Sequence, residues 1–297
     1  MINIRFLGQF RVTLDGRPVE IPARPAQLLL AWLALHAGQS QPREILADHL
    51  WPDSSAANAR ANLRHALWQL RAAIDPDPAH TPPCILADAH DVTFNCQSDY
   101  SLDVEMLTRR PPAWTTDALL AAVEAYQGEL LPGFYDPWIV WERERLAAVF
   151  DRRMARLLDY LAAEGRWDEA LAWAERRIAL GDVPEPAYRA LMQAYAARGD
   201  AGRVMATYQR CRKALQDELG VEPSDETRQL AEHLIRHPHI PPPPAPEGPL
   251  WPAGTLAFER QRADLYRAAA RRSNRLALGA LLGLAAAVGV AVASRRR

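Results

Sequence analysis

The fold is decided by one predicted helix, Ser55-Ala-Ala-Asn-Ala-Arg-Ala-Asn-Leu-Arg-His-Ala-Leu-Trp-Gln-Leu-Arg-Ala-Ala-Ile74. At about 100° per residue, its apolar side chains form one continuous stripe. That stripe comprises Ala59, Leu63, Ala66, Leu67, Leu70 and Ile74. Asp75-Pro76 ends the helix, because proline cannot continue a helix and the residue before it avoids helical backbone. A helix with one apolar stripe buries that side and leaves the rest of its surface exposed.

The opposite side of this helix carries side chains that can read DNA. It presents Asn58, Asn62, His65, Trp68 and Gln69, and one flank is lined by Arg60, Arg64 and Arg71. Asn and Gln pair bidentately with adenine and Arg with guanine, while flanking arginines bind phosphates. Residues 54–74 contain three arginines and no acid. We therefore predict that this face contacts DNA. A solvated helix surface in an arginine-rich protein is the alternative interpretation.

The residues before this helix predict strands and two further helices. Ile2 to Ile21 alternates apolar and polar residues as short strands do, with Asp15-Gly16 as a hairpin turn. A helix is expected over residues 25–37. A second opens at Ser40, a capping residue, and closes at Trp51-Pro52. The region thus contributes three helices when the helix over residues 55–74 is included.

The residues after this helix predict the final hairpin of a winged helix-turn-helix. Cys84 to Cys96 reads as two strands about the polar turn of residues 88–91. Strands, three helices and a hairpin, in that order, are typical of a winged helix, whose hairpin lies against the minor groove or the DNA backbone. We therefore add His90, at the turn, to the candidate DNA-contact residues.

From about Leu102 to Arg236 the pattern is helical throughout. Helices are expected near residues 117–127, 138–164, 167–180, 185–198, 200–219 and 224–236. Gly165-Arg-Trp-Asp-Glu-Ala-Leu and Gly199-Asp-Ala-Gly-Arg-Val-Met lie 34 residues apart, which is the period of the tetratricopeptide unit. Such units stack into a curved surface that binds peptides or other domains. Their aromatic residues are interpreted as packing residues: Trp167, Tyr188, Tyr195 and Tyr208.

The last part of the sequence differs in composition from the rest. The whole chain of 297 residues has a net charge of −1, yet residues 255–297 hold nine arginines and two acids. Residues 276–293 contain no charged residue and reach roughly 27 Å as a helix, enough to cross a bilayer core. We expect a transmembrane helix there, contacting membrane lipid. The arginines before it favour cytoplasmic domains anchored to the inner membrane.

Enzymatic activity is not expected, and neither is a cofactor. Lys213 is the one lysine of the sequence and lies far from any glycine-rich turn, which excludes a phosphate-binding loop. No Gly-x-Ser-x-Gly motif and no zinc-ligand spacing is present. His233, His237 and His239 lack a carboxylate or thiol partner, and Pro238 separates the last two, so no metal site is predicted.

Cys84 and Cys96 lie symmetrically about His90 in the predicted hairpin. Directly opposed residues of antiparallel strands are close enough for a disulfide. A redox pair is therefore one interpretation of these cysteines, and two reduced, half-buried thiols are the other.

Two groups of motifs resemble a known family. Phe6-Leu7-Gly8, Asp15-Gly16, Leu50-Trp51-Pro52-Asp53, Ala59-Arg60 and Leu70-Arg71 look like the OmpR-type winged helix of the antibiotic regulatory protein (SARP) family. Tyr126-Gln-Gly-Glu-Leu-Leu-Pro-Gly133, Trp138 and Trp141-Glu-Arg-Glu-Arg-Leu146 look like the bacterial transcriptional activator domain that follows it in that family. The resemblance covers roughly residues 3–236. It implies a regulator, often an activator, that binds direct-repeat promoter sites as tandem dimers and contacts RNA polymerase.

These observations combine into one predicted architecture. The fold class is mainly α with small β elements: a winged helix-turn-helix, a tetratricopeptide-like helical domain and a C-terminal transmembrane helix. The expected divisions are 1–98 (winged helix), 99–236 (activator domain), 237–254 (Pro-rich linker), 255–275 (basic helix) and 276–293 (membrane span). The predicted function is a membrane-tethered regulator that binds double-stranded DNA, contacts RNA polymerase or another protein, and forms a homodimer. The alternative is a membrane-anchored scaffold whose winged helix no longer binds DNA.

Overall fold

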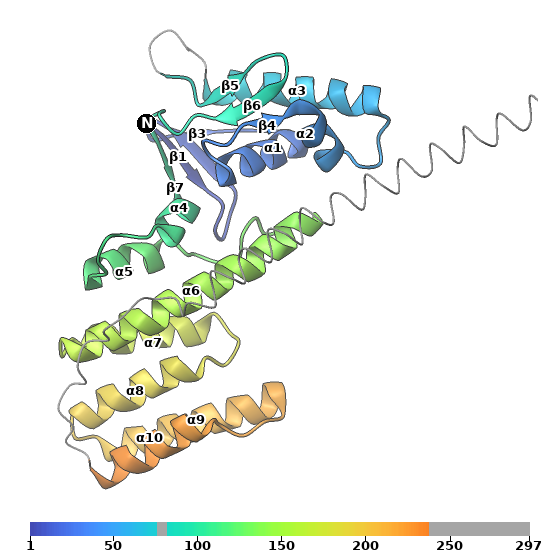
Figure 1. Cartoon of the computed structure of the whole chain (residues 1–297). Helices are drawn as coiled ribbons and strands as arrows, with labels where there is room; N and C mark the ends of the chain where they lie inside the picture. The colour runs from blue at the N-terminus through green and yellow to red at the C-terminus, as the bar shows by residue number, and fades with distance from the viewer. Residues whose placement is uncertain (76–81, 238–297) are drawn as a thin grey trace, which may run out of the picture. The chain divides into compact units, whose positions relative to one another are not determined.

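The computed structural model describes residues 1–75 and 82–237 (Figure 1). Its N-terminal part contains a four-stranded sheet in the order β3-β2-β1-β7. The strands are β1 (Ile2–Arg5), β2 (Arg11–Leu14), β3 (Arg17–Val19) and β7 (Tyr100–Leu102). The turn between β2 and β3 is the predicted one: Leu14 pairs with Arg17, and both Asp15 and Gly16 have positive φ, as a two-residue hairpin turn requires.

Three helices follow the β2–β3 hairpin and pack on one another: α1 (Arg24–Leu35), α2 (Arg43–Leu50) and α3 (Ala56–Ile74). The predicted apolar stripe of α3 is buried along its whole length, from Ala59 to Ile74. The Ser55 side chain caps α3 by accepting a hydrogen bond from the Asn58 N–H. The prediction of Ser40 as the cap of the second helix is wrong, because residues 41–42 form a strand instead and α2 begins only at Arg43.

That strand belongs to a second, three-stranded sheet, ordered β4-β6-β5. It consists of β4 (Gln41–Pro42), β5 (Ile85–Ala87) and β6 (Asp91–Phe94). Ile85 pairs with Phe94, so Cys84 lies opposite Asn95 and not opposite Cys96. Cys84 is buried, whereas Cys96 lies in the turn beyond β6 and is exposed, and both thiols are free. The redox-pair interpretation is therefore wrong in this structure.

The remainder of the described chain is helical, as predicted. The helices are α4 (Asp103–Thr108), α5 (Thr116–Glu124), α6 (Pro137–Ala163), α7 (Trp167–Ala179), α8 (Glu185–Ala197), α9 (Ala201–Leu219) and α10 (Asp225–Arg236). Tyr188 is buried, and Tyr195 and Tyr208 pack against a cluster of buried apolar residues, which confirms them as packing residues.

The 34-residue period predicted from the sequence is visible in the backbone. Gly165 lies in the α6–α7 turn and Gly199 in the α8–α9 turn, both with positive φ. After each glycine the next residue donates a backbone hydrogen bond five residues back, from Arg166 to Leu161 and from Asp200 to Tyr195. Positive φ costs glycine little, and the bonds satisfy carbonyls at the helix end. Two equivalent helical hairpins therefore follow one another, as in tetratricopeptide repeats.

The winged helix and the helical part are joined through main-chain hydrogen bonds. The Leu131 N–H donates to the Phe6 carbonyl at 2.8 Å, and the Gly8 N–H donates to the Glu129 carbonyl at 2.9 Å. The pairing is a β-bridge between Leu7 and Leu130. It joins the two sequence motifs that carry the resemblance. The predicted boundary between residues 98 and 99 stays a prediction, and β7, beyond it, completes the first sheet by pairing with β1.

Side chains strengthen the same junction. Asp103, at the start of α4, accepts hydrogen bonds from the backbone N–H groups of Phe6 and Leu7 through one carboxylate oxygen, at 2.9 and 2.8 Å. From α1, Arg24 donates to the Gly133 carbonyl at 3.2 Å. Because the backbone and the side chains both cross this boundary, the two parts are packed together as neighbours in one compact unit.

The expected transmembrane element requires a correction. No helix within residues 1–75 and 82–237 is both long and apolar enough to span a membrane. The longest, α6, is interrupted by charged residues from Glu142 to Asp159. The proposed span at 276–293, the basic helix at 255–275 and almost all of the linker lie outside the described residues. We therefore remove the transmembrane helix from the fold class and withdraw the membrane localisation and the lipid contact.

Candidate nucleic-acid interface

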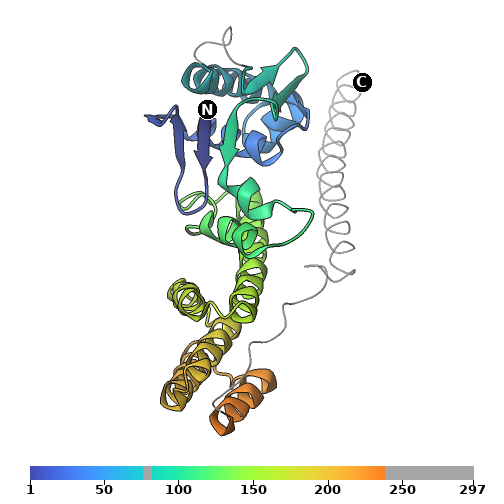
Figure 2. The same ribbon diagram turned by 90° about the vertical axis from the view of Figure 1, so that its left-hand side faces the viewer.

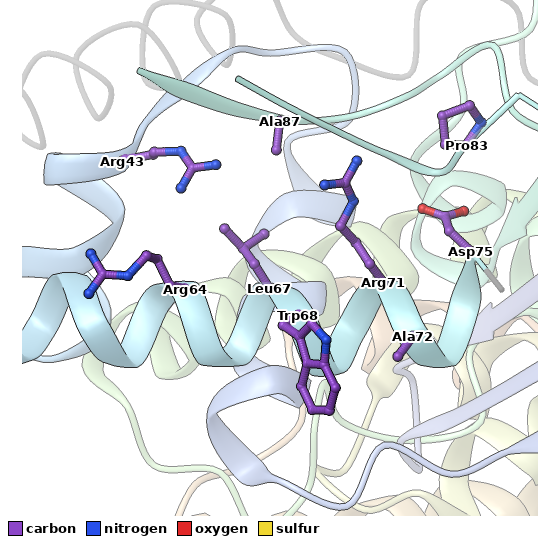
Figure 3. A pocket seen from close by; sticks show the side chains of 9 residues that line it. All are labelled: Arg43, Arg64, Leu67, Trp68, Arg71, Ala72, Asp75, Pro83 and Ala87. Carbon is purple, nitrogen blue, oxygen red and sulfur yellow. The ribbon is translucent and has the colours of Figure 1, made fainter. Parts of the chain in front are cut away.

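The candidate interface is formed by α3 and the β5–β6 hairpin, which lie side by side in both views (Figure 1 and Figure 2). A hollow of about 670 Å³ separates them, and Figure 3 shows the side chains around it. Its lining residues are Arg43, Arg64, Leu67, Trp68, Arg71, Ala72, Asp75, Pro83 and Ala87. The buried stripe of α3 fixes which side chains face this hollow, because it prevents the helix from rotating.

Three arginines converge on the hollow. Arg64 and Arg71 come from α3, as the sequence analysis predicted for its basic flank, and Arg43 comes from the first turn of α2. Arg43 was missed, because nothing in the sequence brings residue 43 to the hairpin. Its backbone N–H donates to the His90 carbonyl at 2.8 Å, which holds it there. Three guanidinium groups around one hollow suit an anionic ligand.

The acid in this hollow is already engaged by the protein. Asp75 accepts hydrogen bonds from the backbone N–H groups of Cys84, at 2.7 Å, and Ile85, at 3.0 Å. Its carboxylate thereby ties the end of α3 to the start of β5. The hydrogen bonds fix the distance between the helix and the hairpin, so the width of the hollow depends on Asp75.

The predicted reading face of α3 is open to solvent. Asn58, Asn62, His65 and Trp68 are exposed, and Gln69 is half-buried. The Trp68 side chain is 67% exposed, an unusual position for a tryptophan, and its ring stacks near that of His65 with 6.0 Å between the centroids. In Figure 3, Arg71 extends from α3 toward the hairpin, whereas the Trp68 ring lies at the other edge of the helix. The face thus combines amides, an imidazole and an indole beside the arginines.

Arg60 lies apart from this hollow. It faces Glu44 of α2 at 4.0 Å, and both side chains are largely exposed. An exposed pair at this distance contributes little, about 1 kcal/mol or less. Arg60 is therefore available to an incoming phosphate, but it does not join the three arginines of the hollow.

The hairpin turn places His90 at an exposed position beside two acids, Asp88 and Asp91. Asp88 accepts hydrogen bonds from the backbone N–H groups of His90 and Asp91, at 2.7 and 2.8 Å. These bonds lower the pKa of the Asp88 carboxyl, because they stabilise its charged form. Asp88 therefore builds the turn that presents His90.

Two small sheets and three helices in the arrangement of a winged helix are followed by a helical part. Residues 95–235 match the family model described as the bacterial transcriptional activator domain. The resemblance to SARP-type transcriptional regulators seen in the sequence is thereby confirmed.

Three curated relatives align with more than three quarters of this chain. The transcriptional regulatory protein EmbR of Mycobacterium tuberculosis is 26% identical over 79% of the chain and 63% of its own length. The regulatory protein DnrI of Streptomyces peucetius is 27% identical over 79% of the chain and 92% of its own length. The regulatory protein AfsR of Streptomyces coelicolor is 24% identical over 77% of the chain, which spans only 24% of that larger protein.

A solved structure supports the fold. Mycobacterium tuberculosis EmbR, in complex with a low-affinity phosphopeptide, superimposes with a TM-score of 0.66 over 79% of this chain and 65% of EmbR, at 20% identity. At that identity the likeness concerns the arrangement of helices and strands alone.

Proposed function

We propose that this chain is a transcriptional regulator that binds double-stranded DNA through α3 and the β5–β6 hairpin. The observation that carries the proposal is the convergence of Arg43, Arg64 and Arg71 on one hollow beside an exposed, acid-free helix face. In this arrangement α3 enters the major groove and the hairpin serves as the wing against the neighbouring backbone. On the basis of the family likeness, the proposed direction of regulation is activation.

Each group of side chains has its own part in the proposed complex. The arginines of the hollow and Arg60 neutralise phosphates and set the position of the protein on the duplex. Asn58, Asn62, His65 and Gln69 contact base edges, and the apolar ring of Trp68 suits contact with a thymine methyl group. His90 meets the backbone at the wing. The helical domain contacts RNA polymerase or another protein, and the homodimer expected from the family remains part of the proposal.

The test is binding of the full chain to a fluorescent duplex taken from upstream of its own gene, measured by anisotropy at several salt concentrations. The logarithm of the affinity should fall steeply and linearly with the logarithm of salt, because phosphate contacts release counterions. Arg64→Ala and Arg71→Ala should each weaken binding to every duplex and reduce the salt slope by about one.

A matched pair of variants separates contacts to bases from contacts to phosphates. Asn62→Ala should change the preference among duplexes, at about 1–3 kcal/mol per contacted base pair, with the salt slope unchanged. Arg212→Ala is the control, since Arg212 lies on α9 and pairs with Glu222 of the same helical part. It should leave DNA affinity as it is.

One result would contradict the proposal. If the full chain binds the duplex no better than competitor DNA at low salt, the winged helix serves protein contacts instead, as in the scaffold interpretation. Equal effects of Arg64→Ala and Arg212→Ala on DNA affinity would also contradict the proposal, because the loss of affinity would then not depend on the hollow.

A further inference from the structure

The helical part contains a groove that the proposed DNA contact does not use. A hollow of about 520 Å³ lies between the loop before α6, the first half of α6 and the end of α7. A second hollow, of about 260 Å³, continues along α6 toward the start of α8. The two share Asp151, Arg177 and Asp182 in their walls and so form one elongated depression, which we term the α6 groove.

The walls of the α6 groove are largely apolar. In the larger hollow the rings of Tyr126 and Phe150 are stacked, with 4.2 Å between their centroids, beside Val140 and Leu180. Val140 is 40% and Leu180 43% exposed, which leaves their apolar surfaces open to a partner. The smaller hollow continues this surface with Met154, Leu158 and two prolines. Apolar surface of this kind, lining a groove, favours burial by another chain.

The cations of the groove are used within the protein. Arg143 donates to the carbonyls of Leu130, Leu131 and Phe134, and its side chain is only 14% exposed. Arg177 donates to the Asp151 carboxylate at 2.8 Å and to the Gly181 carbonyl at 2.7 Å, with its side chain 7% exposed. Both guanidinium groups are thus committed to fixed internal acceptors.

The carboxylates, in contrast, are presented to solvent. Glu129 and Asp151 remain about half exposed, at 54% and 49%, although each faces an arginine. Glu144 and Asp182 are exposed, and neither takes part in an ion pair within residues 1–75 and 82–237. The charge offered to an incoming molecule is therefore negative, around an apolar floor. Asp151, Glu129 and Asp182 also raise the pKa of the Tyr126 phenol, after the larger effect of its burial.

We propose that the α6 groove binds a basic amphipathic peptide segment of a partner protein, with apolar side chains on the floor and Arg or Lys side chains against Glu144 and Asp182. Charge complementarity selects this occupant, since an acidic or phosphorylated segment would be repelled by the rim carboxylates. The proposal rests on the partner-binding half of the proposed function and is independent of its DNA-binding half.

The probe is a fluorescein-labelled synthetic peptide of about 14 residues, roughly four helical turns, with leucines on one side and arginines on the other. Its twin carries glutamate in place of each arginine. Anisotropy with the full chain, in the absence of DNA, should show binding of the arginine peptide at least about tenfold tighter than of the twin. The advantage should shrink with added salt.

Variants locate the binding. The double variant E144Q/D182N should lower the affinity for the arginine peptide by about two- to tenfold, because each exposed charge contributes modestly to binding. Asparagine tolerates the positive φ of Asp182, so the backbone is kept. Leu180→Ala should weaken the binding of both peptides, because it removes apolar surface from the floor of the α6 groove. The control is D217N/E218Q, two exposed acids of α9, which should leave binding unchanged.

The proposal is overturned if the two peptides bind alike, or if E144Q/D182N and D217N/E218Q have equal effects. It is also overturned if the wild-type chain sediments as a dimer that E144Q/D182N dissociates, since a second copy would then fill the groove. All these variants should bind the upstream duplex like the wild type. A failure of the groove proposal is thereby distinguishable from a failure of DNA binding.

Discussion

Gly8 and Gly128 lie so close together that a Cβ atom on Gly128 would be 3.0 Å from the Cα atom of Gly8. Gly8 follows the first strand, and Gly128 precedes the segment that pairs with it. The backbones approach to this distance because the Gly8 N–H must reach the carbonyl of Glu129. A missing side chain at each position is thus what allows the winged helix to dock on the helical domain.

Gly128→Ala should therefore lower the melting temperature by about 5 °C or more, because it adds a steric clash to a backbone conformation that suits only glycine. Gly133→Ala is the matched control: Gly133 also has positive φ, but nothing lies within 4 Å of its added Cβ atom. It should cost about 1 kcal/mol, or a few degrees. Thermal unfolding followed by circular dichroism measures both, and equal shifts would show that the contact between the glycines does not matter.

Asp75 is expected to control the wing. Asp75→Ala leaves the N–H groups of Cys84 and Ile85 without their acceptor, at about 1–3 kcal/mol for each buried donor. Hydrogen exchange of the Ile85 amide should accelerate about tenfold or more, and DNA affinity should fall with it. Asp48→Ala, which removes an exposed acid of α2, should change neither the hydrogen exchange of the Ile85 amide nor the DNA affinity. Unchanged exchange at Ile85 in Asp75→Ala would contradict the tether.

His49 should make the stability of the domain junction depend on pH. Its ring packs against Trp32, with 4.1 Å between centroids, and lies 6.3 Å from the ring of Trp138, which itself contacts Trp32. The loss of surrounding water lowers the pKa of His49, and the charge of His36 lowers it further. A histidine whose pKa is lowered by folding binds its proton more readily when unfolded, so stability is lost as pH falls below about 6.5.

His49→Phe removes this proton-binding group. Between pH 8 and pH 5 the melting temperature of the wild type should fall more than that of His49→Phe, with the divergence beginning near pH 6.5. Melting curves at half-unit pH intervals provide the comparison. Parallel curves for the two proteins would show that His49 is protonated as easily in the folded state as in the unfolded one.

The three cysteines should differ in reactivity. Burial raises the pKa of Cys84 to about 11 and of Cys211 to about 12, so both thiols stay protonated at neutral pH. Only the thiolate reacts, and Cys96 is the exposed cysteine. An aromatic disulfide reagent should therefore label Cys96 in the native chain and all three cysteines after unfolding. A Cys84–Cys96 cross-link found by mass spectrometry after mild oxidation would disprove this assignment.

Local sequence patterns predicted those elements that local contacts determine. The apolar stripe of α3, the Asp15-Gly16 turn and the helices that follow residue 102 all agree with the structure. Each depends on residues within a few positions of one another. Patterns of this kind also placed Arg64 and Arg71 together on the basic flank of α3, because the position of the apolar stripe fixes the other faces of the helix.

Features that depend on distant contacts could not be predicted. Arg43 reaches the hollow because β4 pairs with β6, about 50 residues later. The relation between Cys84 and Cys96 depended on a one-residue choice of hairpin register that symmetry about His90 did not reveal. The expected contacts with DNA remain predictions for every residue of the candidate site: Asn58, Arg60, Asn62, Arg64, His65, Trp68, Gln69, Arg71 and His90.

The pairing of the first strand affects the order in which the chain can fold during synthesis. β1 pairs on one side with β7, which is translated about 100 residues later. Just beyond the end of β1 the chain pairs with residues 129–131, which are translated about 125 residues later. At about 10 residues per second the strand waits roughly 10 s for these partners. During that time its free edge is open to the strands of neighbouring nascent chains. Slower elongation beyond residue 20 would extend this exposure, so translation speed is expected to influence how much of the protein reaches its folded state.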